Sequence, residues 1–232
     1  MFFRSIIFYL LLYMWTLTLG VLALPYLLLP NSYVRSLANL WISGILELLK
    51  LTCGITYEIK NIENIPDRAV IVASKHQSAF ETLLLFRLVK NSIFIHKREL
   101  FLIPIFGLYL KKSNMISINR NEGAKAIRKM LNEVKQNILN GYSIIIFPEG
   151  TRKKPGDPPD YKTGIAGIYK ESEAEVLPVA VNSGNYWPKH TFIKKPGNII
   201  IKFLKPIPSK LEKSEFLKKV ESVIEDETNK II

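Results

Sequence analysis

The chain has 232 residues, enough for one substantial hydrophobic core and little more than one catalytic domain with an appendage. Its 32 Lys and Arg residues outnumber 20 Asp and Glu residues, and the net charge of +12 favours an anionic partner: a nucleic acid, a phospholipid headgroup, an acidic carrier protein or a phosphorylated substrate. The single cysteine, Cys53, excludes an intramolecular disulfide framework and a cysteine-rich zinc site, so we interpret it as a small packing residue.

The N-terminal part of the chain is strongly apolar. No charged residue occurs from position 5 to position 29, a stretch long enough to cross the ~30 Å hydrocarbon core of a bilayer. A cleavable signal peptide is disfavoured, because Pro25, Tyr26 and Leu27 stand where a small-residue cleavage site is needed. A buried core helix is the other alternative, but such helices seldom lack charge over this length. The stretch therefore predicts a membrane-embedded helix.

A second apolar stretch, residues 33–51, carries apolar side chains at near-helical spacing and predicts an amphipathic partner helix. Pro25 and Pro30 separate the two stretches, so a helical hairpin that dips into one leaflet competes with a true span followed by an interfacial helix. Positive charges lie on both sides of the first stretch, which favours a hairpin returning to the cytoplasmic face. We expect residues 1–51 to anchor the protein and residues 52–232 to form the catalytic domain.

The remainder of the chain alternates short β-branched runs with helical patterns, which is typical of an α/β layer fold. Helices are predicted over residues 78–89 and 121–140, with Gly141 where a left-handed C-terminal cap is expected. Residues 153–162 are rich in proline and charge and predict a loop. Strands are predicted at residues 57–60, 69–73, 92–96, 115–118, 143–147, 176–181 and 198–204. The predicted fold is α/β, with a mixed, largely buried sheet of about seven strands flanked by helices and preceded by the membrane-embedded hairpin.

A histidine and a glutamate stand at the end of the second predicted strand. His76 directly follows the strand, and the C-terminal ends of strands in such sheets are where reacting groups collect. The Glu81 carboxylate would fix the imidazole tautomer if His76 lies in the turn and Glu81 in the first turn of the next helix. A structural interpretation competes with this one, because Ser78 and Glu81 also form a capping box.

A second cluster follows the strand predicted at residues 143–147, in the run FPEGTR. It combines Gly150, which admits close backbone approach, with the hydroxyl of Thr151 and the guanidinium of Arg152. A guanidinium is suited to a phosphate or a carboxylate. Lys97 and Arg120 each follow a predicted strand, so they are candidates for binding the same kind of anion.

In order and spacing, these motifs resemble four blocks of the glycerolipid acyltransferase family, specifically its bacterial 1-acyl-glycerol-3-phosphate acyltransferases. The first block, an Asn-His-x-x-x-x-Asp pattern, is similar to KHQSAFE, which ends at Glu81. The third block matches FPEGTR residue for residue, and the fourth resembles VLPVAV at residues 176–181. The second block resembles KREL with the later Pro104, Gly107 and Arg120.

This resemblance implies an acyl transfer in which His76 takes the proton from an acceptor hydroxyl that attacks an acyl thioester, with Glu81 orienting the imidazole. Lysophosphatidic acid is the implied acceptor, acyl-CoA or acyl carrier protein the donor, and no metal or tightly held cofactor is implied. The location implied is a membrane, the bacterial inner membrane, with the catalytic domain on its cytoplasmic face. The residues expected to bind the glycerol phosphate are Glu149, Gly150, Thr151, Arg152, Lys97 and Arg120.

Two residues depart from the family pattern. Glu81 stands where Asp is usual and adds one methylene, and Lys75 replaces the usual Asn, adding a cation that would lower the imidazole pKa or help hold a phosphate. Three alternatives remain: another lysolipid acceptor, a thioesterase in which the same base activates water, and a non-catalytic membrane-binding or nucleic-acid-binding protein. A nucleic-acid partner is not expected, because the basic residues are interspersed with acidic ones and lack an aromatic-basic motif.

Overall fold

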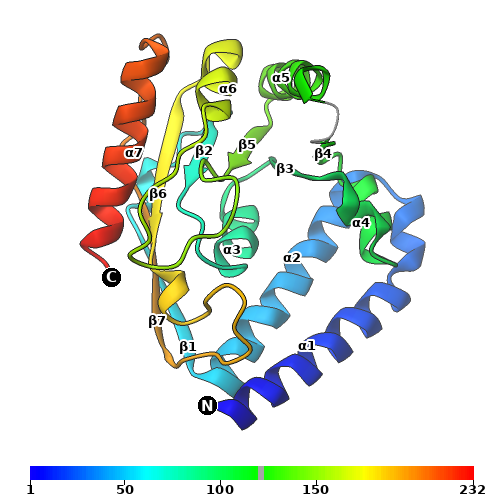
Figure 1. Ribbon diagram of the computed structural model, residues 1–232. Coiled ribbons are helices and arrows are strands. Elements are labelled where there is room, and N and C mark those ends of the chain that lie inside the picture. The colour runs from blue at the N-terminus through cyan, green and yellow to red at the C-terminus, as the bar shows by residue number, and fades with distance from the viewer. Residues whose placement is uncertain (120–122) are drawn as a thin grey trace.

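The computed structural model describes residues 1–119 and 123–232, which form a seven-stranded sheet with helices on both faces (Figure 1). The strands are β1 (Ile55–Lys60), β2 (Ile71–Ser74), β3 (Ser92–Lys97), β4 (Ile116–Ile118), β5 (Ser143–Ile146), β6 (Val176–Val181) and β7 (Gly197–Phe203). The α-helices are α1 (Phe2–Leu22), α2 (Asn31–Leu48), α3 (Phe80–Leu88), α4 (Phe106–Lys112), α5 (Gly123–Leu139), α6 (Gly164–Ser172) and α7 (Lys213–Asn229). All seven predicted strands are confirmed within two residues at each end.

The sheet is mixed, as the sequence predicts. Its strand order is β1-β7-β6-β2-β5-β3-β4. Strands β6, β2, β5, β3 and β4 run parallel to one another, whereas β7 is antiparallel to β6 and pairs with β1 in parallel. Strand β2 therefore lies in the middle of the sheet, and its C-terminal end shares one edge with the ends of β5, β3 and β4.

Two core layers follow from the alternation of side chains along the buried strands. In β2 and the residue before it, Val70 and Val72 join one layer while Ile71 and Ala73 join the other. The layer with Ile71 lies under α5, α6 and α7 (Figure 1). The layer with Val72 lies under α3 and the two N-terminal helices. This double burial explains why the strand sequences are continuously apolar.

The helix predictions are confirmed in part. Helix α3 matches the prediction at residues 78–89, and α5 matches the other from residue 123 onward; positions 121 and 122 lie outside the described residues. Gly141 has φ +81° directly after α5, and residues 153–162 form a loop, as expected. Helices α4, α6 and α7 were not predicted. In α7 the four-residue spacing of Phe216, Val220 and Ile224, all buried, is the signal that identifies it.

The two N-terminal helices form a hairpin whose inner side packs into the hydrophobic core. Phe8 of α1 and Ile45 of α2 are buried in the same layer as Phe80 and Leu84 of α3. The outer side exposes large apolar residues, and both helices are long and apolar enough to cross a membrane by length and composition. The proposed boundary at residue 51 falls in the π-helical turn Leu49–Cys53, which leads from α2 into β1.

One arginine ties the hairpin to the sheet. Arg35 of α2 donates from Nη2 to the carbonyls of Phe86 (3.1 Å) and Val89 (2.9 Å) and from Nη1 to the carbonyl of Ser92 (3.0 Å). These acceptors lie at the C-terminal end of α3 and just beyond it, where backbone carbonyls have no partner within the helix. The guanidinium also lies 4.3 Å from the centre of the Phe86 ring. Arg35 therefore acts as a C-terminal cap on α3 supplied by the N-terminal hairpin.

We expect Arg35→Met to lower the free energy of unfolding by about 3 kcal/mol, because three carbonyls lose a charged donor. Thermal unfolding in detergent should then show a midpoint lower by roughly 6 °C or more. Arg87→Met is the matched control, since Arg87 also joins α3 to α2 but through one exposed bond to Ser43 (2.7 Å). Equal midpoints for the two variants would contradict the capping role.

Candidate active site

His76 lies in the turn after β2, and its side chain contacts Glu81 in the first turn of α3. The Nδ1 to Oε1 distance is 2.8 Å, Glu81 is fully buried, and the His76 side chain is 12% exposed. The same Glu81 oxygen accepts the main-chain N–H groups of Gln77 (2.8 Å) and Ser78 (2.7 Å), and its other oxygen accepts the Ser183 hydroxyl (2.7 Å). A single carboxylate therefore caps α3 and holds the imidazole, so the two interpretations from the sequence are compatible.

The hydrogen bonds to Glu81 fix the state of the imidazole. An ionised carboxylate only accepts hydrogen bonds, so the proton of the His76 imidazole lies on Nδ1 and points to Glu81. Nε2, the opposite ring nitrogen, then keeps its lone pair and is able to accept a proton from a substrate. The Glu81 side chain thus reaches from α3 to both His76 and Ser183.

The FPEGTR segment fixes the rest of His76. The Phe147 ring stacks on the imidazole with centroids 3.7 Å apart and an interplanar angle of 13°. The His76 N–H donates to Glu149 Oε2 (2.8 Å), and its carbonyl accepts the N–H of Lys153 (2.8 Å). Backbone and ring are thus held by residues more than seventy positions away along the chain.

Glu149 lies beneath His76 and has no exposed surface. Its Oε1 forms an ion pair with Lys75 Nζ at 2.7 Å, while its Oε2 binds the His76 N–H. Burial raises the pKa of Glu149, and Lys75 and the His76 N–H partly offset that rise. The sequence predicts that Glu149 binds the glycerol phosphate, whereas the structure places its carboxylate in a buried position, in contact with Lys75 and the His76 N–H.

Lys75 is likewise enclosed, with 3% of its side chain exposed. Its ammonium also contacts both carboxylate oxygens of Glu225 in α7, at 2.7 and 2.9 Å. A lysine held between two carboxylates is not free for a ligand, so Lys75 does not help hold a phosphate as the sequence suggested.

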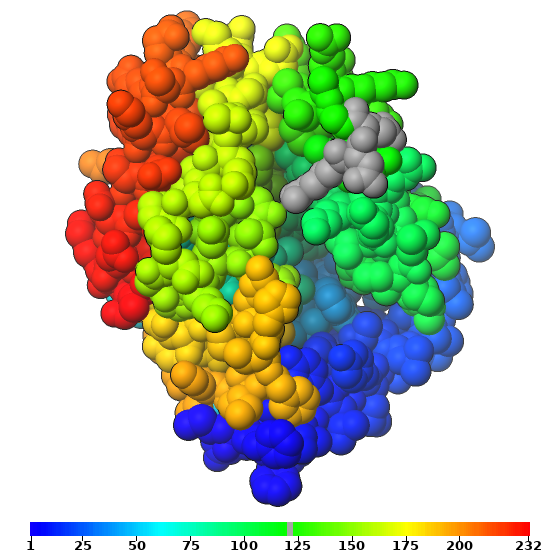
Figure 2. Space-filling model, viewed as in Figure 1, coloured from blue at the N-terminus to red at the C-terminus, as the bar shows by residue number. Residues whose placement is uncertain are grey.

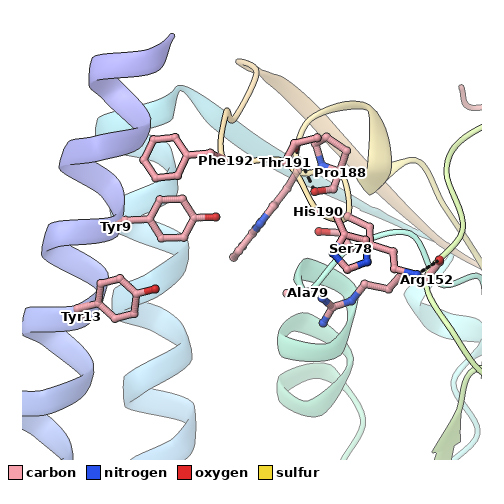
Figure 3. Close-up of a pocket in the computed structure, with 11 residues that line it drawn as sticks. Tyr9, Tyr13, Ser78, Ala79, Arg152, Pro188, His190, Thr191 and Phe192 are labelled. Carbon is pink, nitrogen blue, oxygen red and sulfur yellow. Dashed lines mark hydrogen bonds between the residues drawn. The ribbon is translucent and has the colours of Figure 1, made fainter.

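A pocket of about 440 Å³ opens beside the His76 turn (Figure 3). Tyr9 and Tyr13 of α1 form one wall, and Arg152 and His190 face them from the other side (Figure 3). Figure 2, viewed as in Figure 1, shows a separate hollow between the loop after β5 and the segment around α4. The full lining is Tyr9, Tyr13, Ser78, Ala79, Arg152, Trp187, Pro188, Lys189, His190, Thr191 and Phe192.

The loop after β6 lines the pocket and forms hydrogen bonds with both α1 and the FPEGTR segment. Lys189 Nζ donates to the Thr151 hydroxyl (3.0 Å) and to the carbonyl of Arg152 (3.1 Å). The Lys194 N–H donates to the Ser5 hydroxyl of α1 (2.8 Å), and its Nζ lies 2.7 Å from the Tyr9 hydroxyl. Burial lowers the pKa of Lys194 to about 8.

The other predicted site residues lie along the same edge of the sheet. Gly150 has φ +66°, a left-handed conformation that favours glycine, and Thr151 is exposed beside it. Lys97 is exposed at the C-terminal end of β3, which β5 separates from β2. Arg120 lies outside the described residues.

Sequence reasoning missed two residues that contact His76 or Glu81. Ser183 binds Glu81 and is fully buried, and Phe147 stacks on His76. Ser183 follows β6 as closely as His76 follows β2, so the strand-end rule that selected His76 also indicates Ser183. Phe147 belongs to the motif that was recognised, but its contact depends on how two strand ends meet.

Comparisons with known proteins agree with this site. Residues 56–182 match the Acyltransferase family model. The chain is 34% identical over 200 residues to 1-acyl-sn-glycerol-3-phosphate acyltransferase of Pseudomonas aeruginosa, covering 84% of this chain and 77% of that protein. It is 31% identical over 184 residues to the enzyme of that name from Limnanthes alba, covering 78% and 65%.

A solved structure has the same fold over nearly the whole chain. The crystal structure of PlsC, the 1-acyl-sn-glycerophosphate (LPA) acyltransferase of Thermotoga maritima, superposes with a TM-score of 0.79 at 25% identity. The match covers 98% of this chain and 95% of that one. Motifs, fold and relatives agree, and the chain belongs to the Acyltransferase family.

Proposed function

We propose that this protein transfers a fatty acyl group from an acyl thioester to the sn-2 hydroxyl of lysophosphatidic acid, giving phosphatidic acid for phospholipid biosynthesis. The observation that carries the proposal is the His76 and Glu81 pair beside a pocket lined by Arg152. Relatives from a bacterium, plants and the mouse bear the name 1-acyl-sn-glycerol-3-phosphate acyltransferase, which supports this choice of acceptor over another lysolipid.

The reaction follows from the tautomer of His76. Nε2 takes the proton of the acceptor hydroxyl while that oxygen attacks the thioester carbonyl, and Glu81 stabilises the imidazolium that forms. The tetrahedral intermediate then expels the thiolate, which takes the proton back from His76. The acyl group passes directly to the acceptor, so no residue is acylated.

The phosphate of the acceptor is assigned to the cationic side of the site. The guanidinium of Arg152 lines the pocket and matches phosphate geometry with paired N–H donors. Thr151 and Gly150 precede it in the same turn, and exposed Lys97 stands at the end of β3. The thioester donor is acyl-CoA or acyl carrier protein, both of which are anionic and suit the net charge of +12.

The membrane location follows from the exposed apolar side of the α1 and α2 hairpin. The pocket has Tyr9 and Tyr13 of α1 as one wall, so a lipid acceptor would reach it from the bilayer surface. We assign the protein to the bacterial inner membrane, with the catalytic domain on the cytoplasmic face, where CoA and carrier-protein thioesters are available.

We expect His76→Ala to lower kcat about 1,000-fold or more, because the general base is lost. The measurement is formation of phosphatidic acid from lysophosphatidic acid and acyl thioester in vesicles, with released fatty acid quantified in parallel. His96→Ala, in β3, should retain activity within about threefold. Transfer that survives the His76 change would reject the mechanism, and fatty acid as the main product would indicate a thioesterase.

A second prediction concerns the carboxylate. Glu81→Gln should lower kcat about 100-fold or more with KM little changed, because an amide stabilises the imidazolium far less than a carboxylate does. Ser183→Ala should lower kcat much less, since it removes only one of four hydrogen bonds to the carboxylate. Steady-state kinetics on both variants provide the test, and equal losses would show that Glu81 serves only as a helix cap.

A third prediction tests the assignment of the phosphate. Arg152→Ala should raise KM for lysophosphatidic acid by about 10- to 100-fold, the value of a charge-assisted hydrogen bond to phosphate, with a smaller change in kcat. Arg152→Lys should recover part of the loss. Lys154→Ala, an exposed neighbour in the same loop, is the control and should leave KM within about twofold. A rise confined to KM for the thioester would assign Arg152 to the donor.

A further inference from the structure

A buried cluster of one cation and two carboxylates lies behind His76. Lys75 Nζ is 2.7 Å from Glu149 Oε1 and 2.7 Å from Glu225 Oε1. The side chains of Lys75, Glu149 and Glu225 are 3%, 0% and 16% exposed. The Tyr161 hydroxyl donates to Glu225 Oε1 (2.9 Å) and closes the cluster on one side. Neither Glu225 nor Tyr161 lines the pocket beside His76.

The charges in this cluster depend on one another. Burial alone would lower the pKa of Lys75, but its close contacts with the Glu149 and Glu225 carboxylates outweigh burial and raise it. Burial also raises the pKa of Glu149, Lys75 opposes this, and the neighbouring Glu225 adds to it. The ammonium is therefore what allows two carboxylates to stay close together out of water.

The cluster is joined to the catalytic residue through Glu149, whose two oxygens divide their contacts. One oxygen pairs with Lys75, and the other accepts the main-chain N–H of His76. Without Lys75, the two carboxylates would repel each other, and Glu149 would take up a proton or move. Either change weakens the hydrogen bond from the His76 N–H to Glu149, which fixes the position of His76 at the end of β2. Displacements of about 1 Å in a catalytic group cost roughly 100-fold in rate.

We propose that Lys75, Glu149 and Glu225 form a positioning unit that holds His76 in the position needed for proton transfer. Helix α7 then supports the catalytic site through Glu225. This inference rests on the proposed function. Glu225 is 150 residues away from Lys75 in the sequence and supplies the second carboxylate that the buried ammonium contacts. It lies beyond the motif blocks, which end at residue 181.

A general role of α7 in stability is the competing account, and the chain provides a matched control for it. Lys202 of β7 and Glu227 of α7 form an ion pair two residues further along the same helix. This pair also ties α7 to the sheet, and its side chains are 27% and 20% exposed. Neither residue contacts His76, Glu81 or Glu149 through a hydrogen bond or ion pair described in the structure.

The test measures kcat, KM for both substrates and the unfolding midpoint of the full-length protein in vesicles or detergent. Lys75→Gln should lower kcat about 100-fold with both KM values within about threefold of the wild type. The double variant Lys75→Gln, Glu225→Gln should recover at least tenfold of that loss, because it removes the unpaired charge. Lys202→Gln and Glu227→Gln should leave kcat within about twofold, whatever their unfolding midpoints.

A readout independent of turnover separates this inference from the proposed function. The proton on His76 Nδ1 should give a low-field NMR signal in protein labelled with 15N-histidine, assigned by its loss in His76→Gln. Lys75→Gln should shift or broaden that signal, and the double variant should restore it. A wild type that does not acylate lysophosphatidic acid would defeat the proposed function while leaving this signal as the test of positioning.

Three results would overturn the positioning unit: an unchanged kcat and NMR signal in Lys75→Gln, a double variant no better than the single one, or equal loss of kcat in the control variants. If Lys75→Gln does not fold, Glu225→Gln carries the test, because its amide oxygen still accepts from Lys75. That variant should lower kcat by about threefold to tenfold with unchanged KM, and wild-type kinetics in it would likewise overturn the proposal.

Discussion

The hydrogen bond from the His76 N–H to Glu149 is the constraint on which the active site depends. It joins the turn after β2 to the turn after β5, two strands that pair directly in the sheet. With that bond in place, the Phe147 ring stacks on the imidazole and the Lys153 N–H meets the His76 carbonyl. Glu81 then needs to restrain only the ring. The FPEGTR segment thus holds the His76 main chain and ring and lines the pocket through Arg152.

The N-terminal hairpin is linked to His76 through helix α3. Arg35 satisfies carbonyls at the end of α3, and α3 begins with the carboxylate that holds His76. Phe8 and Ile45 are buried in the layer that supports β2. The hairpin therefore has a structural role, and its inner side packs into the domain that the sequence places after residue 51.

Much of this structure could be predicted because its signals are local. The strands are short apolar runs. His76 and Glu81 are only five positions apart on the two sides of a strand-to-helix turn, so their contact was also predictable. Long-range contacts were not predictable from one sequence. The burial of Glu149 depends on Lys75 in another turn, and the partner of Lys75 is Glu225, 150 residues away. No local pattern encodes such pairing, so the contacts of Glu149 with Lys75 and with the His76 N–H were not predicted.

The wall formed by Tyr9 and Tyr13 has a practical consequence for handling the protein. Removing the apolar helices to obtain a soluble catalytic fragment would take away one side of the pocket and the Ser5 contact that secures the loop at Lys194. Detergent molecules that cover α1 would compete for the surface a lipid must cross to reach that pocket. The choice of detergent is thus expected to change the measured activity of the enzyme as well as its solubility.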